Sequence, residues 1–379
     1  MIILAIIFAI FVYGMIAATL GTILPNLSER FHLTPKQNGN IAFAQALGLI
    51  LASLAVGPLL DAEGKKIGLV LGLTLISLAL FALPHSRGYR NILLLLFGLG
   101  LGGGIVVTGA NALASDVGGT HRASILNLVN LFFGLGGFVT PFIAANLFSK
   151  NWIRLCYAIA GFTVITLSIE IATRMPGAAG PHSFIAADMG QVLGRPVILL
   201  LDLFLFLYVS CEVGVWNWLP RHLIAQGVPE SRALNILSVG FALGLLVGRF
   251  LASPVLMHIS AVTILLIASV AMVITTFLML RTRKSMAALV LVGLAGLSMA
   301  PVFPTVLAIV GNVSPRMTST AIGFAITCGW IGLAVSSRMI GAIAGGNPLG
   351  LQKALMVLPA SAVLMVALSL VIRAILPHG

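Results

Sequence analysis

Twelve apolar stretches alternate with short polar connections along this chain of 379 residues. A helix needs about 20 apolar residues to cross the hydrocarbon core of a bilayer. We therefore predict an all-α membrane protein with twelve transmembrane helices, and we expect the first stretch to be retained as a helix rather than cleaved. Their approximate bounds are 2–25, 38–60, 67–84, 91–114, 123–148, 152–173, 196–220, 232–256, 261–280, 286–310, 320–344 and 352–375.

The longest connection divides these helices six and six. It covers 174–195 and is rich in proline and glycine, whereas the other connections have only a few residues. Composition of this kind is typical of linkers between compact units. We therefore predict an N-terminal six-helix bundle over 1–173, a linker over 174–195, and a C-terminal six-helix bundle over 196–379.

The two halves also repeat each other. Ala46–Leu49 reads Ala-Leu-Gly-Leu, and the same four residues recur as Ala242–Leu245, 196 positions later. A proline follows each quartet at the same distance. A Leu-Pro pair that we expect to end the first and seventh helices recurs at an offset of 195, with its prolines at Pro25 and Pro220. Two six-helix halves in parallel repeat are typical of one class of transporter.

A carboxylate stands inside the seventh predicted helix. Burying Glu212 in hydrocarbon costs roughly 2.5–3.5 kcal/mol, so it must face a partner, the bundle interior or a water-filled cavity. Helical spacing places Tyr208, Glu212 and Trp216 on one face, with Asn217 beside them. This pattern predicts a site for a polar solute. The alternative is a structural carboxylate that a neighbouring helix satisfies.

The composition excludes several classes of protein. Hydrophobic residues make up 59% of the chain and charged residues only 8%, against about 25% charged in a soluble protein. The formal charge of +12 reflects few acids, and the bases are scattered through loops, so we expect no nucleic-acid partner. The three cysteines are separate in the sequence. We therefore expect no disulfide, no metal and no cofactor, and the partner is the lipid bilayer.

The connection after the second helix carries the strongest motif. It reads Gly-Pro-Leu-Leu-Asp-Ala-Glu-Gly-Lys-Lys over residues 57–66. This resembles the major facilitator superfamily, whose loop between helices 2 and 3 reads G-x-L-x-D-x-x-G-[RK]-[RK]. The resemblance implies the two-bundle fold of that superfamily and a cytoplasmic gating loop. The residues of this loop are Gly57, Asp61, Gly64, Lys65 and Lys66.

The chemistry of the gating loop suits a reversible contact. Glycine permits a tight turn. Asp61 can cap the N-terminus of a neighbouring helix or pair with a base, and such a contact would form and break as the halves rock. By the resemblance this loop is cytoplasmic, which places the linker 174–195 and both termini in the cytoplasm as well, in a plasma membrane or bacterial inner membrane. The positive-inside rule opposes this orientation, because the outer connections then hold more bases than the inner ones.

Shorter patches are similar to the fucose–galactose–hexose symporter family, whose helix 7 commonly reads Y-V-G-A-E-V and whose helix 10 carries F-P-T. The resemblance implies that a monosaccharide or similar polyol is moved together with a cation, most simply a proton. Two protonatable family positions are occupied by Gly21 and Val107 in this chain, so proton coupling by an acid would run through Glu212. The patches are 14–25, 108–111, 126–128, 208–220 and 298–305.

A sugar pocket needs amides, a carboxylate and flat aromatic rings that converge in an apolar cavity. For each asparagine, an interhelical hydrogen bond is an equally good explanation. Trp218 can belong instead to the aromatic belt at the membrane interface. The expected substrate-binding residues are Gln45, Asn111, Asn127, Asn130, Tyr208, Glu212, Trp216, Asn217, Phe303, Asn312 and Trp330, with Phe133 and Trp218 as further aromatic candidates.

We therefore predict a monomeric secondary active transporter that moves a sugar or sugar-like solute by alternating access, coupled to a proton through Glu212. The alternatives are a transporter or exporter of another small polar or amphipathic solute, and a receptor that does not transport. An enzyme is not expected, because all seven histidines fall in loops or at helix ends. The glycines of the fourth stretch indicate close helix packing and not a nucleotide loop.

Overall fold

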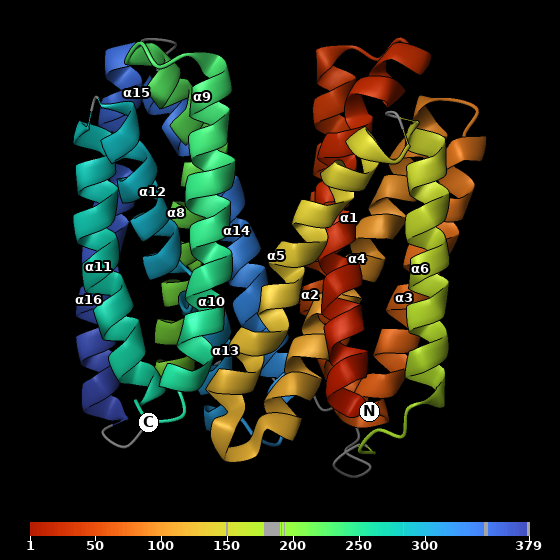
Figure 1. Cartoon of the computed structure of the whole chain (residues 1–379). Coiled ribbons are helices and arrows are strands. Elements are labelled where there is room, and N and C mark those ends of the chain that lie inside the picture. The colour runs from red at the N-terminus through yellow and green to blue at the C-terminus, as the bar shows by residue number, and fades with distance from the viewer. Residues whose placement is uncertain are drawn as a thin grey trace. The chain divides into compact units, whose positions relative to one another are not determined.

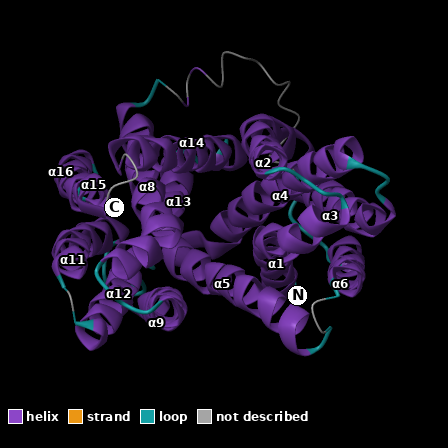
Figure 2. Ribbon diagram, turned by 90° about the horizontal axis from the view of Figure 1, so that it is seen from above, coloured by secondary structure: helices purple, strands orange, loops and turns teal. Residues whose placement is uncertain are grey.

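The computed structural model describes residues 1–148, 151–177, 190, 192, 194–282, 284–344 and 348–376. Within them the chain is helical and has no strand (Figure 2). The helices are α1 (Ile2–Arg30), α2 (Pro35–Glu63), α3 (Lys65–Ala82), α4 (Tyr89–Gly118), α5 (Arg122–Asn146), α6 (Trp152–Ala172), α8 (Pro196–Ala225), α9 (Glu230–Asn235), α10 (Leu243–Val255), α11 (Ala261–Arg281), α12 (Ser285–Met299), α13 (Val302–Val313), α14 (Thr318–Ala344), α15 (Pro348–Leu355) and α16 (Val357–Ile375).

These helices confirm the predicted all-α membrane fold. In the part of the chain that is described, eleven stretches are long and apolar enough to cross a bilayer, and one of them, Tyr89–Asn146, contains both α4 and α5. Each of the twelve predicted spans therefore has a helical counterpart. The large apolar side chains left exposed on these helices have the character of a surface that faces lipid.

Two predicted helix ends are wrong. We expected Pro25 and Pro220 to close the first and seventh helices, but α1 continues to Arg30 and α8 to Ala225. Proline removes one backbone donor, and its neighbours in a packed membrane bundle can satisfy the carbonyl that it frees. The two Leu-Pro pairs are thus internal to their helices.

Three predicted spans are interrupted. The eighth consists of α9, a π-helical segment η3 (Ile236–Ala242) and α10, so its backbone locally makes wider turns. The tenth is divided into α12 and α13 next to Pro301. Proline has no backbone N–H to donate, and its ring clashes with the carbonyl of the preceding helical turn. The twelfth is divided into α15 and α16 at Met356.

The chain forms two compact units. Unit 1 comprises Met1–Val117, Val129–Gly190 and Ser314–Thr327, and unit 2 comprises Gly118–Leu128, Gln191–Val313 and Cys328–Gly379. Within unit 1, α6 packs on α3 and α1, and within unit 2, α11 lies beside α12 and α16 (Figure 1). Most of the predicted linker 174–195 lies outside the described residues, and the proposed division into bundles stays a prediction.

The sequence repeat has a structural counterpart inside each unit. In unit 1, a Cβ added to Gly48 of α2 would collide with the carbonyl of Phe97 on α4. The residues 196 positions later behave alike in unit 2, where a Cβ on Gly244 of α10 would collide with the carbonyl of Gly293 on α12. The repeat therefore preserves a close backbone contact that only glycine permits.

Candidate functional site

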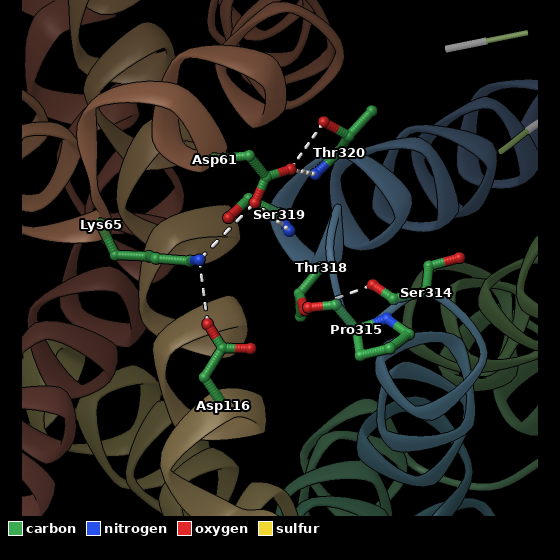
Figure 3. Close-up of polar contacts among 8 residues, drawn as sticks. All are labelled: Asp61, Lys65, Asp116, Ser314, Pro315, Thr318, Ser319 and Thr320. Carbon is green, nitrogen blue, oxygen red and sulfur yellow. Dashed lines mark hydrogen bonds and ion pairs between the residues drawn. The ribbon is translucent and has the colours of Figure 1, made fainter. Parts of the chain in front are cut away.

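Asp61, near the end of α2, binds the N-terminus of α14 (Figure 3). Its Oδ1 accepts from the backbone N–H of Ser319 at 3.0 Å, and its Oδ2 accepts from the backbone N–H and the hydroxyl of Thr320 at 2.8 and 2.7 Å. The first backbone N–H groups of a helix have no partner inside it, and the helix dipole favours an anion there. Asp61 therefore caps α14 from another helix, as the motif predicts.

Lys65 balances the charge of this contact (Figure 3). Its Nζ lies 3.6 Å from Asp61 Oδ1 and 2.9 Å from Asp116 Oδ2 on α4. Lys65 is buried, and buried charges are retained when they are paired. Both expected partners of Asp61, a helix N-terminus and a base, are thus present at once. The sequence did not single out Asp116, because it lies just beyond the predicted span 91–114, where a charged residue is ordinary.

The other residues of the gating loop hold its backbone in place. A Cβ on Gly57 would lie 2.5 Å from the Cα of Thr320, so α2 and α14 touch at this glycine. Gly64 ends α2 with a φ of 96°, which favours glycine. The Nζ of Lys66 donates to the carbonyls of Ile171 and Thr173 at 2.6 and 2.9 Å, at the C-terminal end of α6.

In unit 2, three polar residues gather around a buried tyrosine. Tyr208 is fully buried, and its hydroxyl interacts electrostatically with the Glu212 carboxylate and with the Arg249 guanidinium. Neither contact has the geometry of a well-formed hydrogen bond. Arg249 is buried on α10 and donates from Nε to the carbonyl of Ala300 at 3.4 Å. Glu212 is therefore a half-buried acid that shares a tyrosine with a base.

Sequence reasoning missed Arg249, although a signal for it existed. It is the only charged residue away from the ends of the predicted span 232–256. An ionisable residue inside a membrane helix indicates a functional site by default. Arg249 thus supplies a positive charge at the same Tyr208 hydroxyl that Glu212 acts on.

The tryptophan candidates on α8 and α14 differ in exposure: the ring of Trp216 is partly exposed, whereas Trp218 and Trp330 are half-buried. Trp216 is 37% exposed and meets Phe241 of η3 edge to face, with 5.2 Å between the ring centroids. The indole N–H groups of Trp218 and Trp330 are buried and have no hydrogen-bond partner among the described residues. Asn217 is exposed and donates to the Ser337 hydroxyl at 3.4 Å. Two buried indole donors are thus left without a protein partner in the described part of the chain.

The amide candidates make hydrogen bonds with protein groups. In unit 1, Nδ2 of Asn130 donates to Oδ1 of Asn111, and Nδ2 of Asn111 donates to the carbonyl of Val107, both at 2.7 Å. In unit 2, Asn127 Nδ2 donates to the carbonyl of Ala123 at 2.9 Å and to the hydroxyl of Thr305 at 3.2 Å. The Oδ1 of Asn127 has no partner among the described residues.

Three further candidates lie in other surroundings, and a fourth, Phe133, stacks on Tyr13 of α1. Asn312 accepts a hydrogen bond from Nη1 of Arg122, at the end of α13. Gln45 is buried where α2 packs closely on Gly100 of α4. Phe303 is half-buried in the first turn of α13. Each of these positions has a packing role, and a contact with substrate remains a prediction.

The sequence model of the Major Facilitator Superfamily matches residues 6–337. The chain belongs to this superfamily of membrane transporters. The resemblance noted in the gating loop is thereby confirmed, and the chain is an integral membrane protein with the major facilitator fold.

Two relatives show how far the similarity extends. Bypass of stop codon protein 6 of Saccharomyces cerevisiae is 27% identical over 267 residues, which are 63% of this chain and 53% of that protein. The chain therefore matches about half the length of the yeast relative. A TsgA homolog of Erwinia tasmaniensis is 22% identical over 342 residues, which are 87% of this chain and 84% of that protein.

Solved structures of the superfamily share the fold. The transporter FucP in its outward conformation superimposes with a TM-score of 0.84 at 17% identity over 98% of each chain. The proton:xylose symporter XylE, bound to 6-bromo-6-deoxy-D-glucose, gives a TM-score of 0.78 at 14% identity over 97% of this chain and 94% of its own. FucP is described as the Escherichia coli fucose:proton symporter.

Proposed function

We propose that this chain is a secondary active transporter that moves a sugar or sugar-like solute together with a proton by alternating access. The observation that carries the proposal is the half-buried carboxylate of Glu212 beside Tyr208, Arg249 and the partly exposed ring of Trp216. A sugar offers hydroxyls to such charged groups and an apolar C–H face to an aromatic ring. The shared fold of a fucose:proton and a proton:xylose symporter supports this class of solute.

Asp61 supplies the gate in this proposal. Its bonds to Ser319 and Thr320 form in one conformation and break in the other, as the bundles 1–173 and 196–379 rock against each other. The loop 57–66 then faces the cytoplasm, and both termini lie on the same side, in a plasma or bacterial inner membrane. The transporter acts as a monomer, because one chain supplies both bundles.

The substrate class is tested first by binding. The purified protein is screened by thermal shift against monosaccharides, nucleosides and lipophilic cations. We expect stabilisation by at least one of L-fucose, D-galactose and D-xylose, because binding to the folded state alone raises the unfolding temperature. Stabilisation only by nucleosides or lipophilic cations would replace the sugar proposal with a transporter or exporter of that solute.

The role of Glu212 is tested by substitution with glutamine, which keeps the shape and removes the proton site. In proteoliposomes with an imposed pH gradient, we expect Glu212→Gln to abolish accumulation of the radiolabelled sugar, a loss of about tenfold or more. Counterflow exchange separates two roles: exchange that persists assigns Glu212 to coupling, and exchange that is also lost assigns it to binding.

Glu170→Gln is the matched control, because Glu170 is a buried acid on α6 and belongs to unit 1, whereas Glu212 belongs to unit 2. We expect it to accumulate sugar like the wild type. Equal accumulation by wild type and Glu212→Gln contradicts coupling through Glu212.

A further inference from the structure

A second carboxyl on α8 is buried more deeply than Glu212. Asp202 is 5% exposed, and its Oδ1 has no hydrogen-bond partner among the described residues. In the same part of the chain no base forms an ion pair with it, since the ion pairs found there join Lys65 to Asp61 and Asp116. Burying an acid in a membrane helix without such partners costs free energy, so acids of this kind are rare and indicate a functional site.

The elements around Asp202 hold few ionisable groups. On α14, the thiol of Cys328 is close enough to interact with it electrostatically. The adjacent α13 has no ionisable residue, and on α16 the only one is Arg373, which is exposed near the helix end. On α8 itself, Tyr208 and Glu212 lie one and a half to three turns further along. Of the cations on these helices, Arg221 is nineteen residues from Asp202 along α8, and Arg338 is ten residues from Cys328 along α14. Among the described residues, neither of them nor Arg373 is found to act on Asp202.

Glu170 provides an instructive contrast. Both of its oxygens are buried and have no hydrogen-bond partner among the described residues, but the charge of Lys66 acts on it. It lies on α6, which packs on α3 and α1 within unit 1. Asp202 lacks such a base and shares its helix with Glu212. Burial alone thus does not distinguish the two acids, whereas their electrostatic surroundings do.

The surroundings of Asp202 also coincide with a boundary in α14. Residues of this helix up to Thr327 belong to unit 1, and residues from Cys328 onward belong to unit 2. Cys328, which interacts with Asp202, is therefore the first residue of α14 whose contacts group with those of α8. A neutral carboxylic acid costs less to bury than a carboxylate, while access to water favours the carboxylate.

We propose that Asp202 is a proton-binding site of the transport cycle, separate from Glu212, which holds a proton while α14 covers it and releases it to water when α14 moves. The proposal rests on the proposed transport function. Asp202 and Glu212 are ten residues apart on one helix, or about 15 Å along its axis. Each acid can therefore exchange its proton with water at a different depth of the membrane.

The first test measures the proton itself and requires no solute. Infrared difference spectra between acid and alkaline buffer report the C=O stretch of every carboxyl that titrates in the purified protein. We expect Asp202→Asn to lose one component of this band and Asp202→Glu to restore it at a shifted frequency. Glu170→Gln, the matched buried acid, leaves that component in place. A spectrum of Asp202→Asn that superimposes on the wild type overturns the proposal.

The second test asks whether this proton drives transport. In proteoliposomes, labelled L-fucose, D-galactose and D-xylose are measured in counterflow and under a pH gradient. We expect Asp202→Asn to keep counterflow within about twofold of the wild type and to lose gradient-driven accumulation about tenfold, with recovery in Asp202→Glu. Wild-type accumulation by Asp202→Asn overturns a role in the cycle.

The two tests separate this inference from the proposed function. If the wild type moves none of the three sugars, the sugar proposal fails, while the infrared band still decides whether Asp202 binds a proton. If sugars move and the band is insensitive to Asp202, the transport function stands and the second proton site does not exist. Asp202→Glu keeps both tests interpretable if Asp202→Asn folds poorly.

Discussion

Tyr13 of α1 and Tyr208 of α8 occupy equivalent positions in the repeat, 195 residues apart, yet they meet different chemistry. Tyr13 stacks on Phe133 with 5.2 Å between the ring centroids, whereas Tyr208 interacts with Glu212 and Arg249. The positions that correspond to these two charges in unit 1 hold Ala17 and Ser53. The repeat therefore preserves the scaffold, and this charged cluster belongs to the second half alone.

The contrast is reversed at the gating loop. Asp61 stands at the end of α2 and binds the first turn of α14, while the residue 196 positions later is Met257, which is exposed. One half thus supplies the capping carboxylate and the other supplies the buried charged cluster. This division teaches that duplicated scaffolds can diverge at a few polar positions while the helix contacts stay the same.

The largest effect that we expect comes from Arg249→Ala. Removing this buried base takes away the counter-charge that Tyr208 shares with the half-buried Glu212 and leaves a cavity, which costs about 2–5 kcal/mol. We expect a lower yield of folded protein and a lower midpoint of thermal unfolding. Ser53→Ala, at the equivalent position in unit 1, should leave both close to the wild type. A similar response of the two variants would contradict the asymmetry.

The double variant Arg249→Ala with Glu212→Gln sharpens this comparison. It lacks both charges, so we expect it to recover part of the stability lost in Arg249→Ala. The measurement is the thermal midpoint of all three proteins in the same detergent. Additive losses in the double variant would show that the two charges act independently.

A smaller and symmetric effect is expected at the shared scaffold. Gly48→Ala and Gly244→Ala each place a methyl group against a backbone carbonyl of the neighbouring helix, and overpacking of this kind costs about 1–3 kcal/mol. We expect similar losses of thermal stability from the two variants. The control Gly39→Ala has open space around its added methyl group and should be neutral or stabilising. Unequal losses would mean that the two contacts do not contribute alike.

The smallest expected effect on stability concerns the gating loop. Asp61→Ala leaves the backbone N–H groups of Ser319 and Thr320 without their carboxylate, a loss of about 1–2 kcal/mol. We expect slower counterflow with unchanged sugar binding, because the proposed role of the contact is in the conformational change and not in the substrate site. Met257→Ala is the matched control in the second half. Wild-type counterflow rates in Asp61→Ala would remove Asp61 from the gate.

The apolar pattern was sufficient to predict the fold. The twelve spans follow from their length, because the bilayer demands about 20 apolar residues per helix and leaves no other way to satisfy the backbone. The contact of Asp61 with a helix N-terminus could also be expected, since its motif covers a continuous stretch of residues. Both signals are local in the sequence.

The helix interruptions and the polar partners could not be predicted in the same way. The continuation of α1 past Pro25 and the break near Pro301 involve the same residue type, and the surrounding helices decide between them. Asn130 could not be paired with Asn111, nor Arg249 with Tyr208, because each pair joins side chains on two different helices, whose packing decides which faces meet. Burial without a partner, as in Asp202, is likewise visible only after packing.

The sequence by itself therefore determined the medium, the number of spans, the superfamily and the carboxylates that need an explanation. Those properties depend on length, hydropathy and a continuous motif, which no packing can alter. The tertiary structure alone decided which helix Asp61 caps, that Arg249 shares Tyr208 with Glu212, and that Asp202 Oδ1 is buried without a hydrogen-bond partner among the described residues. A charge acts over a few ångströms, and only the packed helices decide what lies within that distance.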